Sequence, residues 1–116
     1  MTHIDRLVEV QCSDPKLFGD HIIKAACRVG TVIYTAWRHS DIIAMLHRER
    51  VAQYINQEMQ GFIDNKFIFH DRYMAGKIAY AARQIPFRRM GHEMISEELW
   101  DNSGKFHIDR SKWRID

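Results

Sequence analysis

Five polar side chains stand where one expected structural element gives way to the next. Arg38 and His39 follow a strand-like run, Gln60 opens a second one, Arg72 begins a helix-like run and Gln84 closes it. Ligand sites commonly lie at such junctions. An arginine offers a planar fork of donors suited to phosphate, and a glutamine can read the edge of a base. This set of side chains therefore suits a nucleotide.

Aromatic residues near these junctions could stack on a base. Phe62, Trp37 and Tyr80 are the candidates. Two simpler readings stay open from the residues alone. An aromatic side chain in a strand usually belongs to the core, and Arg72 could do no more than pair with its neighbour Asp71.

Catalytic and metal-binding patterns are not evident in the sequence. His39 and His47 are eight positions apart, which is not the spacing of a zinc site. Cys27 lies within a strand-like run and is read as a buried structural thiol. Glu97 and Glu98 are adjacent, so they do not face each other as an acid and base pair would, and we read them as a helix start. We predict no enzyme activity, no metal and no cofactor.

Composition points to an ordinary globular protein of 116 residues with a formal charge of only +2. This small surplus does not favour specific binding of nucleic acid. The two cysteines, Cys12 and Cys27, form no C-x-x-C pair, which is typical of a reducing compartment. No apolar run approaches the roughly 20 residues of a membrane span, and the first residues lack a signal-peptide pattern. We expect no membrane contact and a cytoplasmic location.

Two hairpins are predicted from short apolar runs. Residues 22–27 and 32–37 flank a turn in which Gly30 is free to take a positive φ. Residues 60–63 and 67–69 flank a second turn, where Asn65 tolerates the left-handed conformation. An N-terminal strand over Leu7 to Gln11 or a loosely docked arm is also possible, and Ser13-Asp14-Pro15 reads as a turn.

Two helices are predicted between and after these hairpins. The first should run from about Asp41 to Gln57, with Ser40 as its N-cap. The second should follow the N-cap Asp71 and end before Pro86. Its expected buried stripe is formed by Met74, Ala75, Ile78, Ala79 and Ala82. A short helical turn is expected near Ser96.

The predicted fold is therefore α+β: a small antiparallel sheet built from two β-hairpins and packed against two helices. Residues 1–116 should form a single ligand-binding domain, with the N-terminal arm (1–20) and the C-terminal tail (101–116) less well specified. The tail carries Phe106, Ile108 and Trp113, which suggests docking onto a neighbouring subunit.

Three sequence blocks resemble one group of short phage and bacterial proteins. The first, Arg38-His39 followed by Asp41-Ile-Ile, is similar to the group's R-H-x-D-I-I. The second runs from Gln60-Gly-Phe-Ile through Phe69-His-Asp-Arg72 to Gln84-Ile85 and resembles Q-G-F-I-T, F-V-x-R, E-A-x-x-I-A and G-Q-I. The third, residues 91–100, resembles G-x-x-L-x-S-E-D-L-W. One departure is Phe67-Ile68, where the group usually carries Gly-Arg.

The group includes the phage anti-Thoeris sponge proteins, which sequester cyclic ADP-ribose signals made by bacterial TIR-domain defence enzymes. Some of them also hold cyclic oligonucleotides. The resemblance implies an anti-defence protein that captures a cyclic nucleotide without cleaving it, and that forms homo-oligomers with pockets between subunits. It also implies the ligand-binding residues, namely Arg38, His39, Gln60, Phe62, Arg72 and Gln84.

Two other classes of function remain alternatives. A phosphodiesterase-like enzyme could degrade the same signals, although no general base is visible. A module that binds protein or nucleic acid could use the basic cluster of Arg83, Arg88 and Arg89, or residues 47–50. A solvated helix face explains the first cluster, and Glu49 interrupts the second.

Overall fold

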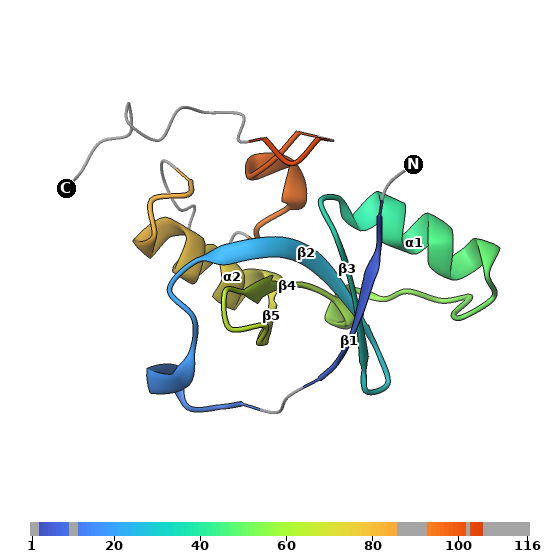
Figure 1. Cartoon of the computed structure of the whole chain (residues 1–116), viewed down its shortest axis with the longest axis horizontal. Helices are drawn as coiled ribbons and strands as arrows, with labels where there is room; N and C mark the ends of the chain where they lie inside the picture. Colours follow the sequence, from blue (N-terminus) through green and yellow to red (C-terminus); the bar gives the residue numbers. More distant parts are fainter. Residues whose placement is uncertain (1–2, 10–11, 86–92, 102, 106–116) are drawn as a thin grey trace.

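A computed structural model of the chain describes residues 3–9, 12–85, 93–101 and 103–105. Its centre is an antiparallel five-stranded sheet with the strand order β1-β3-β2-β4-β5 (Figure 1). Together with two helices this sheet confirms the predicted α+β class. The strands are β1 (Asp5–Val8), β2 (Ile22–Val29), β3 (Val32–Ala36), β4 (Gln60–Asp64) and β5 (Phe69–Asp71).

The first hairpin pairs β2 with β3 as predicted. Val29 lies opposite Val32, and Gly30 in the turn between them has a φ of 63°. A glycine takes this left-handed conformation without the clash that a Cβ would bring. The N-terminal strand β1 pairs with the outer side of β3, from Asp5 opposite Thr35 to Val8 opposite Val32. Its expected bounds of Leu7 to Gln11 were therefore too late, and residues 10–11 lie outside the described part.

The first helix, α1 (His39–Arg48), is shorter than predicted. Its N-cap is Arg38, so the prediction that Ser40 caps it was wrong, and Ser40 lies in the first turn. Arg50, two positions after the last residue of α1, has a φ of 57°. The amide of the next residue, Val51, donates to the carbonyl of Leu46. This is a Schellman motif, a helix end that usually carries glycine at the left-handed position. Because arginine stands there, no stop signal is visible in the sequence before Gln57.

The second helix, α2 (Arg72–Ala81), begins as predicted. The side chain of Asp71 accepts a hydrogen bond from the amide of Met74 at 2.7 Å, which is an N-cap. The helix ends in another Schellman motif, with Arg83 at a φ of 61° and the amide of Gln84 bonded to the carbonyl of Ala79 at 2.7 Å. In both helices, therefore, the second residue after the end is an arginine in the left-handed region.

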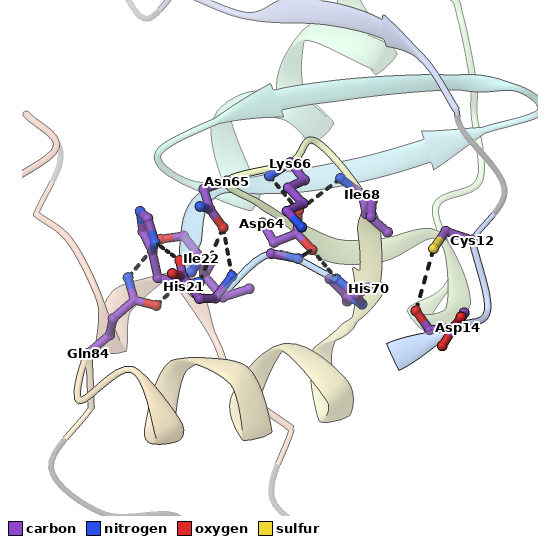
Figure 2. A network of polar contacts seen from close by, with 12 residues as sticks. Cys12, Asp14, His21, Ile22, Asp64, Asn65, Lys66, Ile68, His70 and Gln84 are labelled. Carbon is purple, nitrogen blue, oxygen red and sulfur yellow. Dashed lines mark hydrogen bonds and ion pairs between the residues drawn. The ribbon is translucent and has the colours of Figure 1, made fainter. Parts of the chain in front are cut away.

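The second hairpin, β4 and β5, turns around the buried side chain of Asp64 (Figure 2). Its carboxylate accepts from the amides of Lys66 at 2.8 Å and Ile68 at 3.1 Å, and lies 2.7 Å from Nε2 of His70. The left-handed residue is Phe67, with a φ of 64°, so the prediction of Asn65 was wrong. A three-residue loop of this kind places its left-handed residue last.

Asp64 and Asn65 also hold the segment that leads into β2. The amide of Gly19 donates to the Asp64 carboxylate at 2.8 Å, and the amide of Asp20 donates to Oδ1 of Asn65 at 2.8 Å. Figure 2 shows Asp64 and Asn65 side by side at this turn. The predicted turn around Asp14 is confirmed as the start of a short 3-10 helix, η1 (Pro15–Leu17).

Both helices cover the same face of the sheet. The strand residues that contact them are two positions apart, and such residues point to the same side of a sheet. Ala25 and Phe62 pack against Ala75 and Ala79 of α2. Farther along the same face, Cys27, Tyr34 and Ala36 pack against α1 through Ile42, Met45 and Leu46. Figure 1 shows the two helices toward opposite sides of the view. The predicted stripe of α2 is therefore buried at its centre, at Ala75 and Ala79.

The segment after α2 completes the core. Met94, Leu99 and Trp100 are buried beside Phe62 and α2, and the amide of Met94 donates to the carbonyl of Arg72 at 3.1 Å. Two further 3-10 helices are η2 (Gln57–Met59) and η3 (Ser96–Glu98), the latter where a helical turn was expected. The tail residues Phe106, Ile108 and Trp113 lie outside the described residues.

Candidate anion-binding site

One surface hollow of about 390 Å³ brings together four of the six predicted ligand-binding residues. They are Arg38, His39, Gln60 and Arg72, which are separated by as many as 34 positions in the sequence. Known ligand pockets have volumes of about 300 to 1,000 Å³, so this hollow could hold a small molecule. We call it the arginine hollow. Its remaining lining residues are Ser40, Ile43, Ile95 and Glu97.

The arginine hollow forms where several elements begin. Arg38 and His39 stand at the start of α1, Gln60 opens β4, and Arg72 is the first residue of α2. The N-terminal end of a helix carries a partial positive charge, because its first amides have no partner within the helix. Two such ends and two guanidinium groups line the same hollow. These groups attract anions, and the carboxylates of Asp71, Glu93 and Glu97 already stand beside them.

Arg38 reaches across the hollow to the segment after α2. Its Nη1 lies 2.9 Å from Oε1 of Glu97, and its side chain is only 11% exposed. Burial alone would raise the pKa of Glu97, but hydrogen bonds from Ser96 and Arg38 outweigh this effect and lower the pKa. Glu97 is therefore ionised at neutral pH.

Arg72 makes a similar contact. Its Nη2 donates to Oε2 of Glu93 at 2.8 Å, and the carboxylate is 54% exposed. The Nε–H of Arg72 is buried and donates to no acceptor among the described residues. Arg72 also lines a neighbouring hollow of about 160 Å³, together with Gln57, Glu58, Asp71, Tyr73 and Glu93. The guanidinium group thus stands between two depressions of the surface.

His39 is largely buried at the floor of the hollow. Its Nε2 lies 2.6 Å from the carbonyl oxygen of Gly61, and because a carbonyl only accepts, Nε2 carries the proton. Burial lowers the pKa of His39, assisted by the charge of Arg72, although hydrogen bonding to Gly61 opposes the shift. The imidazole is therefore neutral at pH 7 and ties α1 to β4.

Phe62 lies beneath the hollow and has no exposed surface. Its ring centroid is 5.0 Å from that of His39 in an edge-to-face arrangement, and 6.4 Å from that of Trp100. In this structure Phe62 supports the floor of the hollow from the core. Stacking on a ligand would require His39 to move.

Gln84 is placed away from the arginine hollow, and its amide is fully engaged with the backbone. Oε1 accepts from the amide of Ile22 at 2.7 Å, and Nε2 donates to the carbonyl of Ile22 at 2.7 Å (Figure 2). The side chain is 1% exposed. Gln84 therefore joins the end of α2 to the start of β2 in the way that a neighbouring strand would.

The glutamates that pair with the two arginines were missed by sequence reasoning. Glu97 was read as part of a helix start, and Glu93 was not singled out. In the structure Glu98 performs the helix-start role, because its Oε2 accepts from the amide of Ile95 at 2.8 Å. Glu97 instead pairs with Arg38, which lies 59 positions earlier. No local pattern in the sequence signals such a distant partner.

Neither a metal site nor a membrane-spanning helix is found in the described part of the chain. No three His, Cys, Asp or Glu side chains there are grouped so as to hold a metal ion. None of the helices described is long and apolar enough to cross a membrane.

Fold and site together define a small α+β protein with a surface hollow whose lining suits an anionic ligand. The chain belongs to the family of the phage T4 y16D protein, since the sequence model of that family matches residues 21–100. This match contains all three sequence blocks described above. It covers the sheet from β2 onward, both helices and the segment that carries Glu93 and Glu97.

Searches of curated proteins and of solved structures returned no match to this chain.

Proposed function

We propose that this protein is a phage anti-defence protein that sequesters a cyclic nucleotide signal without cleaving it. The observation that supports the proposal is the convergence of Arg38, His39, Gln60 and Arg72 on one hollow. Two guanidinium groups suit phosphate, and the amide of Gln60 suits the edge of a base. The candidate ligands are cyclic ADP-ribose isomers and cyclic oligonucleotides, as the resemblance to anti-Thoeris sponge proteins suggests.

We propose binding rather than catalysis because the polar groups of the hollow are already engaged in ways that do not suit proton transfer. The proton on Nε2 of His39 is directed at a backbone carbonyl. Glu97 is held by Arg38, and its lowered pKa makes it a poor base at neutral pH. The same arrangement leaves the hollow able to hold an anion intact.

The proposal includes self-association in the cytoplasm of an infected cell. β1 stands at the end of the strand order, and Val8 at its tip is 77% exposed. An exposed edge strand can pair with another chain. Light scattering of the purified protein, with and without ligand, would give the number of subunits.

The central experiment is ligand capture. Purified protein is incubated with cyclic ADP-ribose isomers and with cyclic di- and trinucleotides, separated from free ligand and denatured by heat. Mass spectrometry of the supernatant should then recover one of these ligands unchanged. Recovery of a converted product would instead identify an enzyme that degrades the signal, and recovery of none of them would overturn the proposal.

A further inference from the structure

Both arginines of the hollow are paired with glutamates from one short segment. Glu97 lies 2.9 Å from Arg38, and Glu93 lies 2.8 Å from Arg72. The two glutamates are four positions apart, so a single stretch of chain supplies a negative charge to each arginine. The arginines are mostly buried, with 11% and 15% of their side chains exposed. A ligand that needs these arginines must therefore compete with the protein's own carboxylates.

The backbone of this segment is fixed, whereas its two carboxylates are not. Met94, Ser96 and Leu99 are at most 1% exposed, which anchors the segment in the core. The side chains of Glu93 and Glu97, by contrast, are 54% and 59% exposed. Each carboxylate can therefore rotate into water while the backbone stays in place. Opening the site would require a change of side-chain rotamer only.

Exchange of a carboxylate for a phosphate group is energetically reasonable at this position. Ion pairs with an exposed carboxylate contribute little, about 0 to 1 kcal/mol, because water and salt screen them. A phosphate group offers three strong acceptor oxygens to the fork of an arginine, one more than a carboxylate does. A ligand with two anionic groups gains this difference twice, whereas a ligand with one gains it once.

We propose that Glu93 and Glu97 occupy the places of two anionic groups of the ligand and so select for compounds that carry two phosphates or a pyrophosphate. This inference rests on the proposed function, since it names the ligand class of the arginine hollow, which Glu97 lines, and of the neighbouring hollow, which Glu93 lines and which shares Arg72. The glutamates act as internal competitors. They compete with an anion for the arginines and so weaken its binding. A ligand with a single phosphate displaces only one of them.

The test compares inorganic pyrophosphate with inorganic phosphate by calorimetry. The variants are Glu97→Gln, Glu93→Gln and the double variant, because glutamine keeps the shape and the hydrogen-bond acceptor but loses the charge. Each single change should tighten pyrophosphate binding by up to about fivefold, with a larger effect in the double variant. Phosphate should gain less from the double variant than pyrophosphate does.

A matched control is Glu58→Gln. Glu58 lines the neighbouring hollow, and no ion pair with Arg38 or Arg72 is seen for it in the part of the chain that the structure describes. This variant removes the same charge nearby without freeing an arginine, so pyrophosphate affinity should stay within about twofold. The thermal midpoint of every variant is measured to confirm that it folds.

Unchanged or weaker pyrophosphate binding in both single variants and in the double variant would overturn the inference, because the glutamates would then orient the arginines instead of competing with the ligand. Pyrophosphate binding to neither the wild type nor any variant would also overturn it. The capture experiment distinguishes the two proposals. If the variants bind pyrophosphate more tightly but the protein retains no cyclic nucleotide, this inference is supported and the proposed function is rejected.

Discussion

Arg72 shows how one residue can carry both a structural and a functional interpretation. As the first residue of α2 it could simply pair with its neighbour Asp71. In the structure Asp71 instead caps the helix, and the guanidinium group contacts Glu93 and lines two hollows. The pairing of Arg72 with Asp71 was therefore the wrong alternative. A role in ligand binding remains to be tested.

Arg72→Ala should abolish ligand capture and leave the fold intact. The change removes a cation from the hollow, so the ligand recovered in the capture experiment should fall at least about tenfold. The free energy of unfolding should change by only about 1 kcal/mol, because the partner carboxylate is half exposed. The matched control is Arg48→Ala, an exposed residue in the last turn of α1, which should retain the ligand. Loss of the thermal transition in Arg72→Ala would show a structural role instead.

Asp64 is the charged residue on which the fold depends most. Its side chain is fully buried, and it receives four hydrogen bonds, from the backbone amides of Gly19, Lys66 and Ile68 and from the His70 ring. Burial alone would raise the pKa of Asp64, but these hydrogen bonds outweigh it and hold the pKa below its ordinary value of 3.8. A carboxylate with a depressed pKa stabilises the folded state while it is ionised.

Asp64→Asn should lower the free energy of unfolding by about 3 kcal/mol at neutral pH, because the amide presents donors to groups that themselves donate. The folded pKa is lower than the unfolded one, so the stabilisation is complete above pH 3.8 and is lost as the pH falls through the folded value. The difference in free energy of unfolding between wild type and variant should therefore become smaller in acid. Urea titrations across this range measure it, with Glu49→Gln, an exposed carboxylate, as the control. A constant gap would contradict the prediction.

At the scale of elements, two glycines illustrate opposite demands of packing. Gly76 lies inside α2, where a Cβ would meet only the Cβ of Met94 at 3.6 Å. Gly61 lies in β4, where a Cβ would collide with the carbonyl oxygen of His70 and would stand 2.6 Å from Cζ of Phe69. The carbonyl of Gly61 itself accepts the hydrogen bond from His39. The close approach of β5 to β4 therefore helps to form the floor of the hollow.

Gly76→Ala should stabilise the protein by about 1 kcal/mol, because alanine is the better helix former and has room there. Gly61→Ala should destabilise it by about 2 kcal/mol, because the added Cβ forces β5 away. Urea denaturation of the two variants provides the comparison. Equal effects of the two substitutions would show that helix propensity and strand packing have been assigned wrongly.

The turn between β4 and β5 places a bulky residue where a glycine is usual. Phe67 takes the left-handed conformation there, at a φ of 64°. Such a conformation costs a bulky residue about 1 to 2 kcal/mol. The hydrogen bonds to Asp64 offset this cost by fixing the turn.

At the scale of the whole molecule, the reactivity of Cys27 measures whether the sheet and the helices unfold together. It lies in β2, the central strand, has no exposed surface and packs against α1. Burial raises the pKa of its thiol to about 12. Reagents that need a thiolate therefore cannot react with it until the sheet opens.

Alkylation of Cys27 by iodoacetamide should thus follow global unfolding. In a Cys12→Ser variant, the labelling rate under native conditions should be low and should rise with urea in parallel with the unfolded fraction. Cys12 in the wild type is partly exposed and serves as the reactive reference. Rapid labelling of Cys27 without denaturant would show that α1 separates from β2 while the rest of the domain stays folded.

The family match and the structure agree on which part of the molecule forms a unit. Residues 21–100 contain four of the five strands, both helices and the whole arginine hollow. β1 lies before this range and adds to the outer edge of β3. Binding at the hollow should therefore depend little on β1, which is better placed to affect self-association.

The sequence by itself determined the α+β class, the two hairpins and the start of α2, because these depend on local patterns of apolar residues, turn residues and an N-cap. It also identified Arg38, His39, Gln60 and Arg72 as polar groups at element junctions. The ends of both helices were less predictable, since arginine takes the left-handed position where glycine is the usual signal.

Only the tertiary structure decided which of these junctions meet. The start of α1, the start of α2 and the segment 93–97 are brought together by packing on one face of the sheet, and no spacing in the sequence encodes that contact. Packing also separated Gln84 from the other predicted residues by bonding it to Ile22. It paired both arginines with glutamates, because opposite charges brought together at a partly buried surface satisfy each other.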